Sequence, residues 1–99
     1  MAKFSLYPDP DGGGYLLDVQ ADIMRPLNMR VVVPLLPLGV APKPATTLNP
    51  LFVIKDIEHS MVTQFMAAVP TSVLKREVMN VADRSDEIVN AIDLLLRGS

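Results

Sequence analysis

The sequence contains no cysteine, which excludes a disulfide framework and thiolate chemistry. No apolar run reaches about 18 residues, so no helix is expected to span a membrane, and residues 1–10 lack the apolar core of a signal peptide. The net charge is −2, and lysine and arginine are scattered rather than gathered into the basic stripe of a nucleic-acid binder. We therefore expect a cytoplasmic protein that neither enters a membrane nor recognises a nucleic-acid sequence directly.

Groups suited to catalysis or metal binding are also scarce. His59 is the only histidine, and because the adjacent Glu58 would point to the opposite face of a strand, we expect a solvent-facing turn histidine. The sequence has no Gly-x-Ser-x-Gly motif, and its three consecutive glycines lack the Lys-Ser or Lys-Thr of a phosphate loop. Four aspartates share no metal-ligand spacing and are expected in turns and on the surface: Asp9, Asp11, Asp18 and Asp22. We predict no metal, no cofactor and no enzymatic activity.

Apolar residues, by contrast, are plentiful: 49% of the 99 residues are hydrophobic and 20% are charged. This is enough for one domain spanning residues 1–99, although a domain of this size buries only somewhat over ~60% of its unfolded surface. Six methionines add to the apolar total, and methionine adapts well to contact surfaces. Either a hydrophobic dimer interface or an ordinary core with methionine as filler would explain the excess.

Short segments with alternating apolar and polar residues indicate β-strands. Arg30–Leu36 is instead apolar on both faces and rich in valine, so it is expected to be a central strand. Pro34 removes a donor from it, so either the missing N–H faces no partner or the strand bends there. Strands are predicted at Lys3–Tyr7, Tyr15–Gln20, Arg30–Leu36, Leu51–Lys55 and Ser60–Ala67, with a short edge strand at Thr71–Leu74.

Prolines and glycines mark the connections between these strands. Pro8–Gly14 is predicted to be a flexible loop and Ala21–Asn28 a further connection. The proline-rich segment Leu36–Pro50 is predicted to be a long crossover loop with room for one helical turn. Lys55–His59 contains neither Asn-Gly nor Asp-Gly, so a hairpin turn longer than two residues is expected. Lys75–Arg84 fits neither the strand nor the helix pattern.

The clearest period belongs to residues 85–99, SDEIVNAIDLLLRGS. Ser85 is expected to be the N-cap of a helix, and Gly98 suits its C-terminal end. The predicted apolar stripe comprises Ile88, Ala91, Ile92, Leu95 and Leu96, with Val89 at its edge, and the opposite face carries Asp86, Asn90, Asp93 and Arg97. Strands followed by one helix indicate an α+β fold, with an antiparallel sheet covered by the helix through Ile88, Ile92 and Leu95.

Four segments share a pattern with one known family. Tyr15–Ile23 is similar to a strand in which V-D-V-Q-S-D recurs, and Arg30–Leu35 is similar to the strand that follows it, including the proline. Ala67–Leu74 is similar to A-S-V-P-V-S-V, and Glu87–Leu94 to a terminal helix. Each motif alone is weakly specific, but together they run in order through nearly the whole chain. In these four segments taken together, the chain resembles the CcdB toxins.

The resemblance implies a small antiparallel β-barrel-like sheet of the CcdB/MazF type, an SH3-like barrel, with one C-terminal α-helix, and it implies a homodimer. It also implies the toxin of a type II toxin–antitoxin system, which binds the A subunit of DNA gyrase and traps its cleaved-DNA complex. A CcdA-like antitoxin neutralises such a toxin through a disordered tail that folds on binding. The implied mechanism is binding, not catalysis.

The resemblance also implies gyrase contacts, which carry over to Ile23, Met24, Asp93, Leu94, Arg97, Gly98 and Ser99. This chain departs from the family's Trp-Gly-Ile tail, since Arg97 replaces the aromatic residue and Ser99 the apolar end. Asp93 stands where asparagine is usual. Two roles remain open for Arg97: it can pair with Asp93 four residues earlier on the helix, or it can contact a partner.

Antitoxin contacts are expected in two loops, at Pro8, Asp9, Pro10, Asp11 and Gly12 and at Val40, Pro42 and Lys43. Loops beside sheet edges are good docking places. Two other functions stay open. One is a divergent family member that binds antitoxin without poisoning gyrase. The other is a MazF-like ribonuclease, for which charge would come from Arg25, Arg30, Lys43, Lys55 and His59.

Overall fold

The computed structural model describes residues 2–22 and 27–98, and its secondary structure is dominated by short strands and one long helix. The strands are β1 (Ser5–Pro8), β2 (Tyr15–Asp18), β3 (Met29–Pro37), β4 (Leu51–Ile54), β5 (Ile57–Met61), β6 (Ala67–Pro70) and β7 (Met79–Asn80). The helical elements are the 3-10 turns η2 (Thr63–Phe65), η3 (Thr71–Val73) and η4 (Ala82–Arg84) and the α-helix α1 (Ser85–Arg97).

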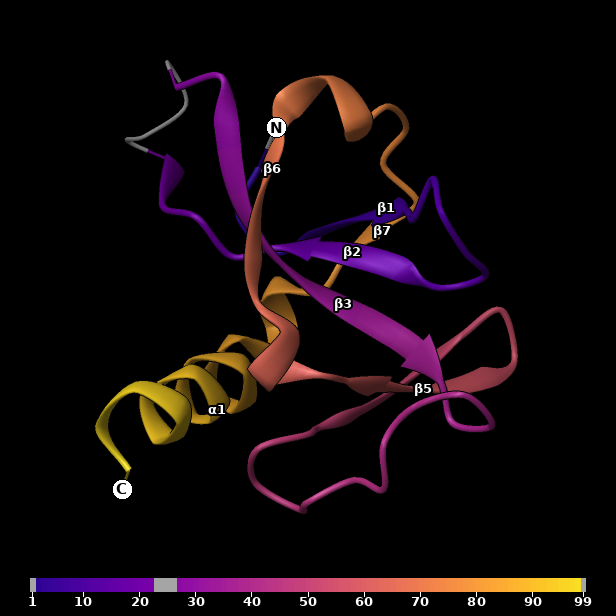
Figure 1. The fold of residues 1–99 in the computed structure, drawn as a ribbon, viewed down its shortest axis with the longest axis vertical. Helices are drawn as coiled ribbons and strands as arrows, with labels where there is room; N and C mark the ends of the chain where they lie inside the picture. The colour runs from indigo at the N-terminus through magenta and orange to yellow at the C-terminus, as the bar shows by residue number, and fades with distance from the viewer. Residues whose placement is uncertain (1, 23–26, 99) are drawn as a thin grey trace.

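The strands form one antiparallel sheet that curls into a half-barrel (Figure 1). The order is β4-β5-β3-β2-β1-β7, and β6 pairs with β3 alongside β5. The chain between β6 and β7 crosses back from β3 to β1, so it closes over one face of the sheet. Helix α1 follows at the other face. The predicted α+β fold with an antiparallel sheet and one C-terminal helix is confirmed.

The place of Pro34 explains how a proline fits in the central strand. On one edge β3 pairs with β2 throughout residues 32–35. On the other edge its partner changes from β6, at residues 29–32, to β5, at residues 35–37. The carbonyl of Pro34 faces this second edge, where it accepts a hydrogen bond from Val62 N at 2.9 Å. Because the N and C=O of a strand residue face the same edge, the missing donor falls in the gap between the two partners. No ladder bond is lost.

Two apolar cores lie on the two faces of the curled sheet. The larger core packs α1 against the sheet through Ile88 and Ala91, which are fully buried. Its other members come mostly from inward-facing strand positions: Phe4, Leu6, Leu17, Val33, Leu35, Phe52, Ile54, Met61 and Val81. The smaller core lies beneath the β6–β7 crossing and comprises Tyr7, Leu16, Val32 and Leu74. The sheet is therefore buried on both faces near β1–β3.

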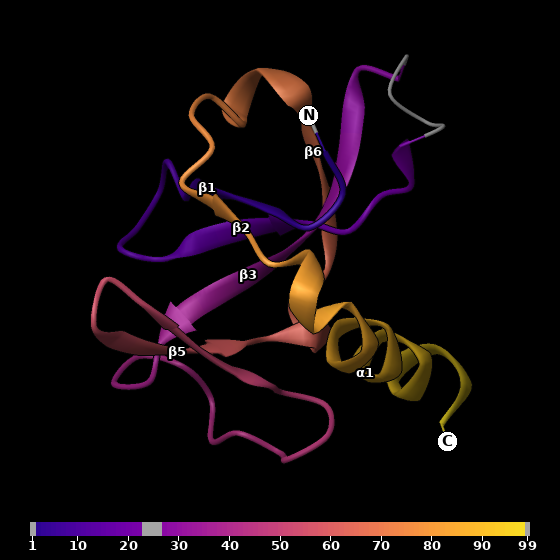
Figure 2. The same cartoon turned by 180° about the vertical axis from the view of Figure 1, so that it is seen from behind.

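The helix begins and packs differently from its prediction. Ser85 has helical backbone angles and donates its N–H to Ala82 O, so the preceding turn η4, and not a Ser85 hydroxyl, leads into α1. Gly98 ends the helix as predicted, with a left-handed φ of 74° and its N–H on Leu94 O at 2.8 Å. Leu95 is 38% exposed. The expected packing through Leu95 is wrong, because the last turns extend beyond the sheet (Figure 2).

Two local expectations about the strands are also wrong. The β4–β5 hairpin has the two-residue turn Lys55–Asp56, with φ of 52° and 66°, instead of a longer loop. Positive φ at both positions matches the strand twist and is normally supplied by Asn-Gly. Because the sequence has Lys-Asp at these positions, it did not indicate a two-residue turn. The segment Thr71–Leu74 begins with η3 and is not a strand, while residues 67–70 form the strand β6.

Replacing Lys55 and Asp56 together by Asn-Gly is expected to stabilise the protein by ~0.5–1 kcal/mol. Both residues adopt positive φ, a conformation that costs L side chains energy and glycine none. Urea denaturation monitored by circular dichroism measures the change. Swapping the same pair to Ala-Ala is the matched control and should destabilise. Equal stability of both variants would contradict this description of the turn.

Candidate functional site

The first candidate surface is the loop between β1 and β2. It closes through Asp9 N to Gly14 O at 3.0 Å and Asp11 N to Asp9 Oδ1 at 2.9 Å. Gly14 lies against the β3 backbone so closely that a Cβ would collide with Leu35 O. Pro8, Pro10, Asp11 and Gly12 remain exposed, and Asp9 partly so. The predicted loop is confirmed, and its base is held against the sheet.

The second candidate surface follows β3. Leu38 N donates to Glu58 O at 3.2 Å, and Val40 N and Ala41 N both bond Pro37 O at 3.0 Å. Val40 is 72% exposed, and Pro42 and Lys43 are exposed as well. Residues 38–50, all described, form turns, and the bond from Asn49 N to Ala45 O at 2.8 Å closes a single helical-type turn, as the sequence allowed. This loop points away from the sheet beside the β4–β5 hairpin (Figure 1).

The fold brings these two loops to one end of the sheet. Tyr15, which opens β2, pairs with Leu35 near the end of β3, and Pro8, which closes β1, pairs with Tyr15. Since the strands are antiparallel, the loop after β1 and the loop after β3 leave the sheet at the same end. The positions of the two loops along the sequence did not indicate that they would lie at the same end of the sheet. The structure thus places all the predicted antitoxin-contact residues at one end of the sheet.

An apolar groove runs beside the first loop. One part, with a cavity volume of about 520 Å³, is lined by Pro8, Pro10, Ser72, Val73, Lys75 and Arg76. An adjoining part, of about 360 Å³, shares Pro10 and Val73 and continues over Val32 to Phe65. Phe65 is half exposed. The groove therefore combines an apolar floor with exposed charges at its rim. The sequence did not indicate the side contributed by residues 72–76, because residues 71–74 were predicted to be an edge strand and residues 75–76 fitted no pattern.

The predicted gyrase contacts on the helix lie at its far end. Arg97 is exposed and pairs with Asp93 through Nη2 and Oδ2 at 3.2 Å, as the spacing suggested. Leu94 is partly buried, and Gly98 is exposed. Ile23, Met24 and Ser99 lie outside the described residues. The described part of this surface is therefore a helix end that extends from the body of the protein (Figures 1 and 2).

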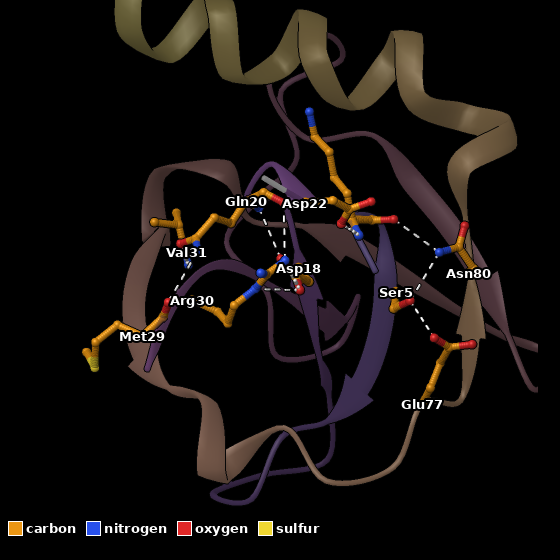
Figure 3. A network of polar contacts seen from close by, with 10 residues as sticks. Ser5, Asp18, Gln20, Asp22, Met29, Arg30, Val31, Glu77 and Asn80 are labelled. Carbon is orange, nitrogen blue, oxygen red and sulfur yellow. Dashed lines mark hydrogen bonds and ion pairs between the residues drawn. The ribbon is translucent and has the colours of Figure 1, made fainter. Parts of the chain in front are cut away.

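Asp18 is not a surface residue, and that expectation is wrong. Its carboxylate is fully buried beside the equally buried Arg30, with Oδ2 at 2.7 Å from Nη2 and 2.9 Å from Nε (Figure 3). Both side chains project toward the smaller core, where the β6–β7 crossing excludes water. Opposite charges in direct contact can be buried together, whereas one alone could not. Simple alternation of apolar and polar residues did not reveal the pair.

Burial affects the ionisation of two groups in this region. Desolvation raises the pKa of Asp18, although hydrogen bonds from Arg30 and Gln20 oppose the shift. Desolvation also raises the pKa of Tyr7, and the carboxylates of Asp18 and Glu77 raise it further. An aspartate with a raised folded-state pKa contributes stability at acid pH that is lost as pH rises through that pKa. The charged form of Asp18 is thus energetically costly at neutral pH.

His59 is likewise buried, which contradicts the expected turn position. Strand β5 begins at Ile57, so His59 lies within the strand opposite Phe52 and faces inward. Its Nδ1 lies 2.8 Å from Ile57 O, and its ring meets Tyr15 edge-on at 5.2 Å between centroids. With Arg30 and His59 both buried, two of the groups considered for RNA cleavage do not reach the surface.

Within residues 2–22 and 27–98, no group of three or more histidine, cysteine or acidic side chains is arranged to hold a metal. Across the same residues, no helix combines the length and apolarity needed to cross a bilayer. The fold and its loops, groove and helix end define a small half-barrel protein whose candidate sites are contact surfaces.

The protein-family model of the CcdB protein matches residues 3–98. That match covers nearly the whole sequence, so the chain belongs to the CcdB family and is a CcdB-like toxin. The toxins of this family are non-enzymatic gyrase poisons. The resemblance and the expectation of a non-catalytic protein are therefore confirmed, and the ribonuclease alternative loses its support.

Proposed function

We propose that this protein binds the A subunit of DNA gyrase and traps the enzyme's cleaved-DNA complex. It acts in the cytoplasm as the toxin of a type II toxin–antitoxin system, and residues 1–99 form its single functional domain. The family match over residues 3–98 is the observation that carries this proposal. Binding requires no catalytic group, and the exposed loops and helix end supply surfaces for it.

The proposed gyrase surface combines Ile23 and Met24 with the helix end: Asp93, Leu94, Arg97, Gly98 and Ser99. The Asp93–Arg97 pair does not prevent this role. Its side chains are 41% and 72% exposed, and exposed i,i+4 pairs contribute only ~0.3–0.5 kcal/mol. A partner carboxylate or aromatic ring can therefore compete for Arg97 at little cost.

The proposed antitoxin surface is the loop end of the sheet, at Pro8, Asp9, Pro10, Asp11, Gly12, Val40, Pro42 and Lys43. The groove beside Pro8 and Pro10 supports this assignment, since an extended peptide can place apolar side chains over Val73 and charged ones near Lys75. A CcdA-like antitoxin tail that folds on binding would supply such a segment.

We also propose a homodimer. Three apolar residues of α1 are solvent-exposed in one chain, namely Val89 at 40%, Leu95 at 38% and Leu96 at 69%. Val89 and Leu96 are seven residues apart and therefore share one side of the helix, and exposed apolar surface on one side of a helix is often used in protein interfaces. Sedimentation equilibrium should give the mass of two chains, and a monomer at all micromolar concentrations would overturn the proposal.

A second candidate function is antitoxin binding without gyrase poisoning. The identity of Arg97 favours it, because the residue lies where the family places an aromatic anchor and is engaged by Asp93. Loss of a buried aromatic anchor commonly costs ~2 kcal/mol or more of binding free energy. The two functions differ in whether purified protein inhibits gyrase at all.

Supercoiling by purified DNA gyrase, run beside a DNA-cleavage assay, tests the proposal. Added protein should inhibit supercoiling and accumulate linear DNA. Arg97→Ala with loss of Gly98 and Ser99 should abolish both effects, whereas Lys55→Ala, a change in the remote hairpin turn, should not. Arg97→Trp should lower the inhibitory concentration by about 30-fold, the equivalent of ~2 kcal/mol. No inhibition by folded wild type at micromolar concentration would leave antitoxin binding as the function.

A further inference from the structure

Strand β6 has one paired edge and one open edge. Its paired edge faces β3, where Ala68 lies opposite Val31. Val31 directs both of its backbone groups away from β6, because its N–H bonds Gln20 Oε1 at 3.1 Å and its C=O accepts from Val19 N at 3.1 Å. Two opposite residues of an antiparallel pair either exchange hydrogen bonds or both point away from each other. Ala68 therefore directs its N–H and C=O to the open edge.

The open edge of β6 is exposed but short. Ala67, Ala68 and Pro70 are all exposed, and across the described residues β6 pairs with β3 alone. Pro70 shares the orientation of Ala68 and has no N–H, so it ends the row of donors. The edge thus offers one N–H and one C=O at Ala68 and a further C=O at Pro70. Unpaired groups of this kind are a template for an added extended segment.

The apolar groove beside the β1–β2 loop borders the same strand. Its part of about 360 Å³ is lined by Ala67, Val69 and Pro70 from β6 and by Asp9–Asp11 from the loop. Successive side chains of a strand point to opposite faces. A segment paired at Ala68 therefore directs the side chains before and after that pair to the face of Ala67 and Val69, where the groove lies.

The charges along the groove indicate which segment fits it. Lys75 and Arg76 line the larger part and are exposed. Among the described residues, neither side chain belongs to an ion pair. Asp9 and Asp11 carry the opposite charge in the adjoining part. The groove therefore favours an extended segment that has alternate apolar residues and an acidic residue at the end next to Lys75.

We infer that β6 binds the antitoxin by strand addition. An extended segment of the antitoxin's disordered tail pairs with Ala68 along the open edge and places its alternate apolar side chains in the groove. The inference rests on the proposed function, which supplies the CcdA-like antitoxin, and it adds the mode of binding and the chemistry of the bound segment.

A disordered tail suits this place better than the edge of a second copy of the chain. A single strand can lie between β6 and the β1–β2 loop, because both line the groove. A strand already paired within a folded sheet would bring its neighbouring strands into that loop. The open edge therefore selects a segment that becomes ordered only when it binds.

Hydrogen exchange on the full chain tests the edge itself. In the free protein, the Ala68 amide should exchange at least tenfold faster than the Val69 amide, which faces β3. A synthetic peptide of the cognate antitoxin's disordered tail should slow exchange at Ala68 at least tenfold. Protection of Ala68 in the free protein would overturn the inference, and loss of that protection on dilution would assign the edge to a second copy.

Proline substitutions at two strand edges provide a matched comparison. Ala68→Pro removes the N–H on the open edge of β6 and takes no bond from the ladder with β3. Val53→Pro does the same on β4, where Pro50 O accepts from Met61 N, so that even-numbered residues bond β5 and Val53 N faces away. Calorimetry with the tail peptide should show at least tenfold weaker affinity for Ala68→Pro and unchanged affinity for Val53→Pro.

Charge reversal tests the chemistry of the segment without touching the edge. Lys75→Glu combined with Arg76→Glu changes two exposed side chains and should weaken tail binding at least tenfold. Cooperative unfolding in urea verifies that each variant is folded.

The outcomes separate the inference from the proposed function. Equal affinity of wild type and folded Ala68→Pro would overturn strand addition and leave the proposed antitoxin function in place. Equal affinity of the charge-reversed variant would overturn the acidic character of the segment. A wild type that does not bind the tail at all would overturn the antitoxin function and this inference together.

Discussion

Asp18→Ala is expected to lower the free energy of unfolding by about 3–5 kcal/mol. The substitution leaves the guanidinium of Arg30, which is 1% exposed, without its counter-ion in the interior. The total stability of a domain is typically only ~5–15 kcal/mol. One missing carboxylate therefore removes a large share of it. Urea denaturation, followed by circular dichroism at neutral pH, measures the loss.

Two further variants identify the cause of that loss. Asp11→Ala removes an exposed carboxylate from the β1–β2 loop and should change stability by no more than ~0.5 kcal/mol. Asp18→Leu combined with Arg30→Met should recover the whole of the loss, because no unpaired charge remains buried. A double variant as unstable as Asp18→Ala would show that shape at these positions, and not charge, dominates.

Phe52→Ala is expected to cost about 3–5 kcal/mol through the cavity that it leaves in the larger core. Phe52 is 3% exposed and packs where β4 faces the helix side of the sheet. The guanidinium of Arg84 also lies over its ring at 4.0 Å from the centroid, a contact worth ~0.5–1 kcal/mol at a partly exposed site. The substitution thus removes a core side chain and its contact with Arg84, the residue that precedes α1.

The adjacent residue provides the matched control for this prediction. Val53 points to the opposite face of β4 and is 64% exposed, so Val53→Ala should change stability by no more than ~0.5 kcal/mol. Each kcal/mol shifts the melting temperature of a domain of this size by ~4–8 °C, so differential scanning calorimetry resolves the two variants easily. Similar melting temperatures for both would contradict the orientation of β4.

Local patterns in the sequence determined much of the fold. The valine-rich run identified β3 as the central strand, and residues of the last segment identified α1 and its end at Gly98. The four-residue spacing of Asp93 and Arg97 indicated their pair as one of two roles open to Arg97. These features depend on near neighbours along the chain, so a period of two or 3.6 residues suffices to reveal them. The family motifs then indicated the class of protein.

Other expectations failed where burial depends on distant segments. Alternation placed Asp18 on one face of a strand, but only the crossing from β6 to β7 turns that face into an interior. His59 is buried because β5 starts at Ile57. That start depends on the two-residue turn before it, whose residues carry none of the usual sequence signals of such a turn. The exposed end of α1 likewise depends on where the sheet stops.

The sequence by itself therefore determined most of the strands, the terminal helix and the family. The tertiary structure decided which faces are covered and which loops meet at one end of the sheet. It also joined Asp18, Gln20 and Arg30 into one network across the β2–β3 connection. The physical reason is that a period records the direction of a side chain, whereas the energy of burying it depends on what lies opposite.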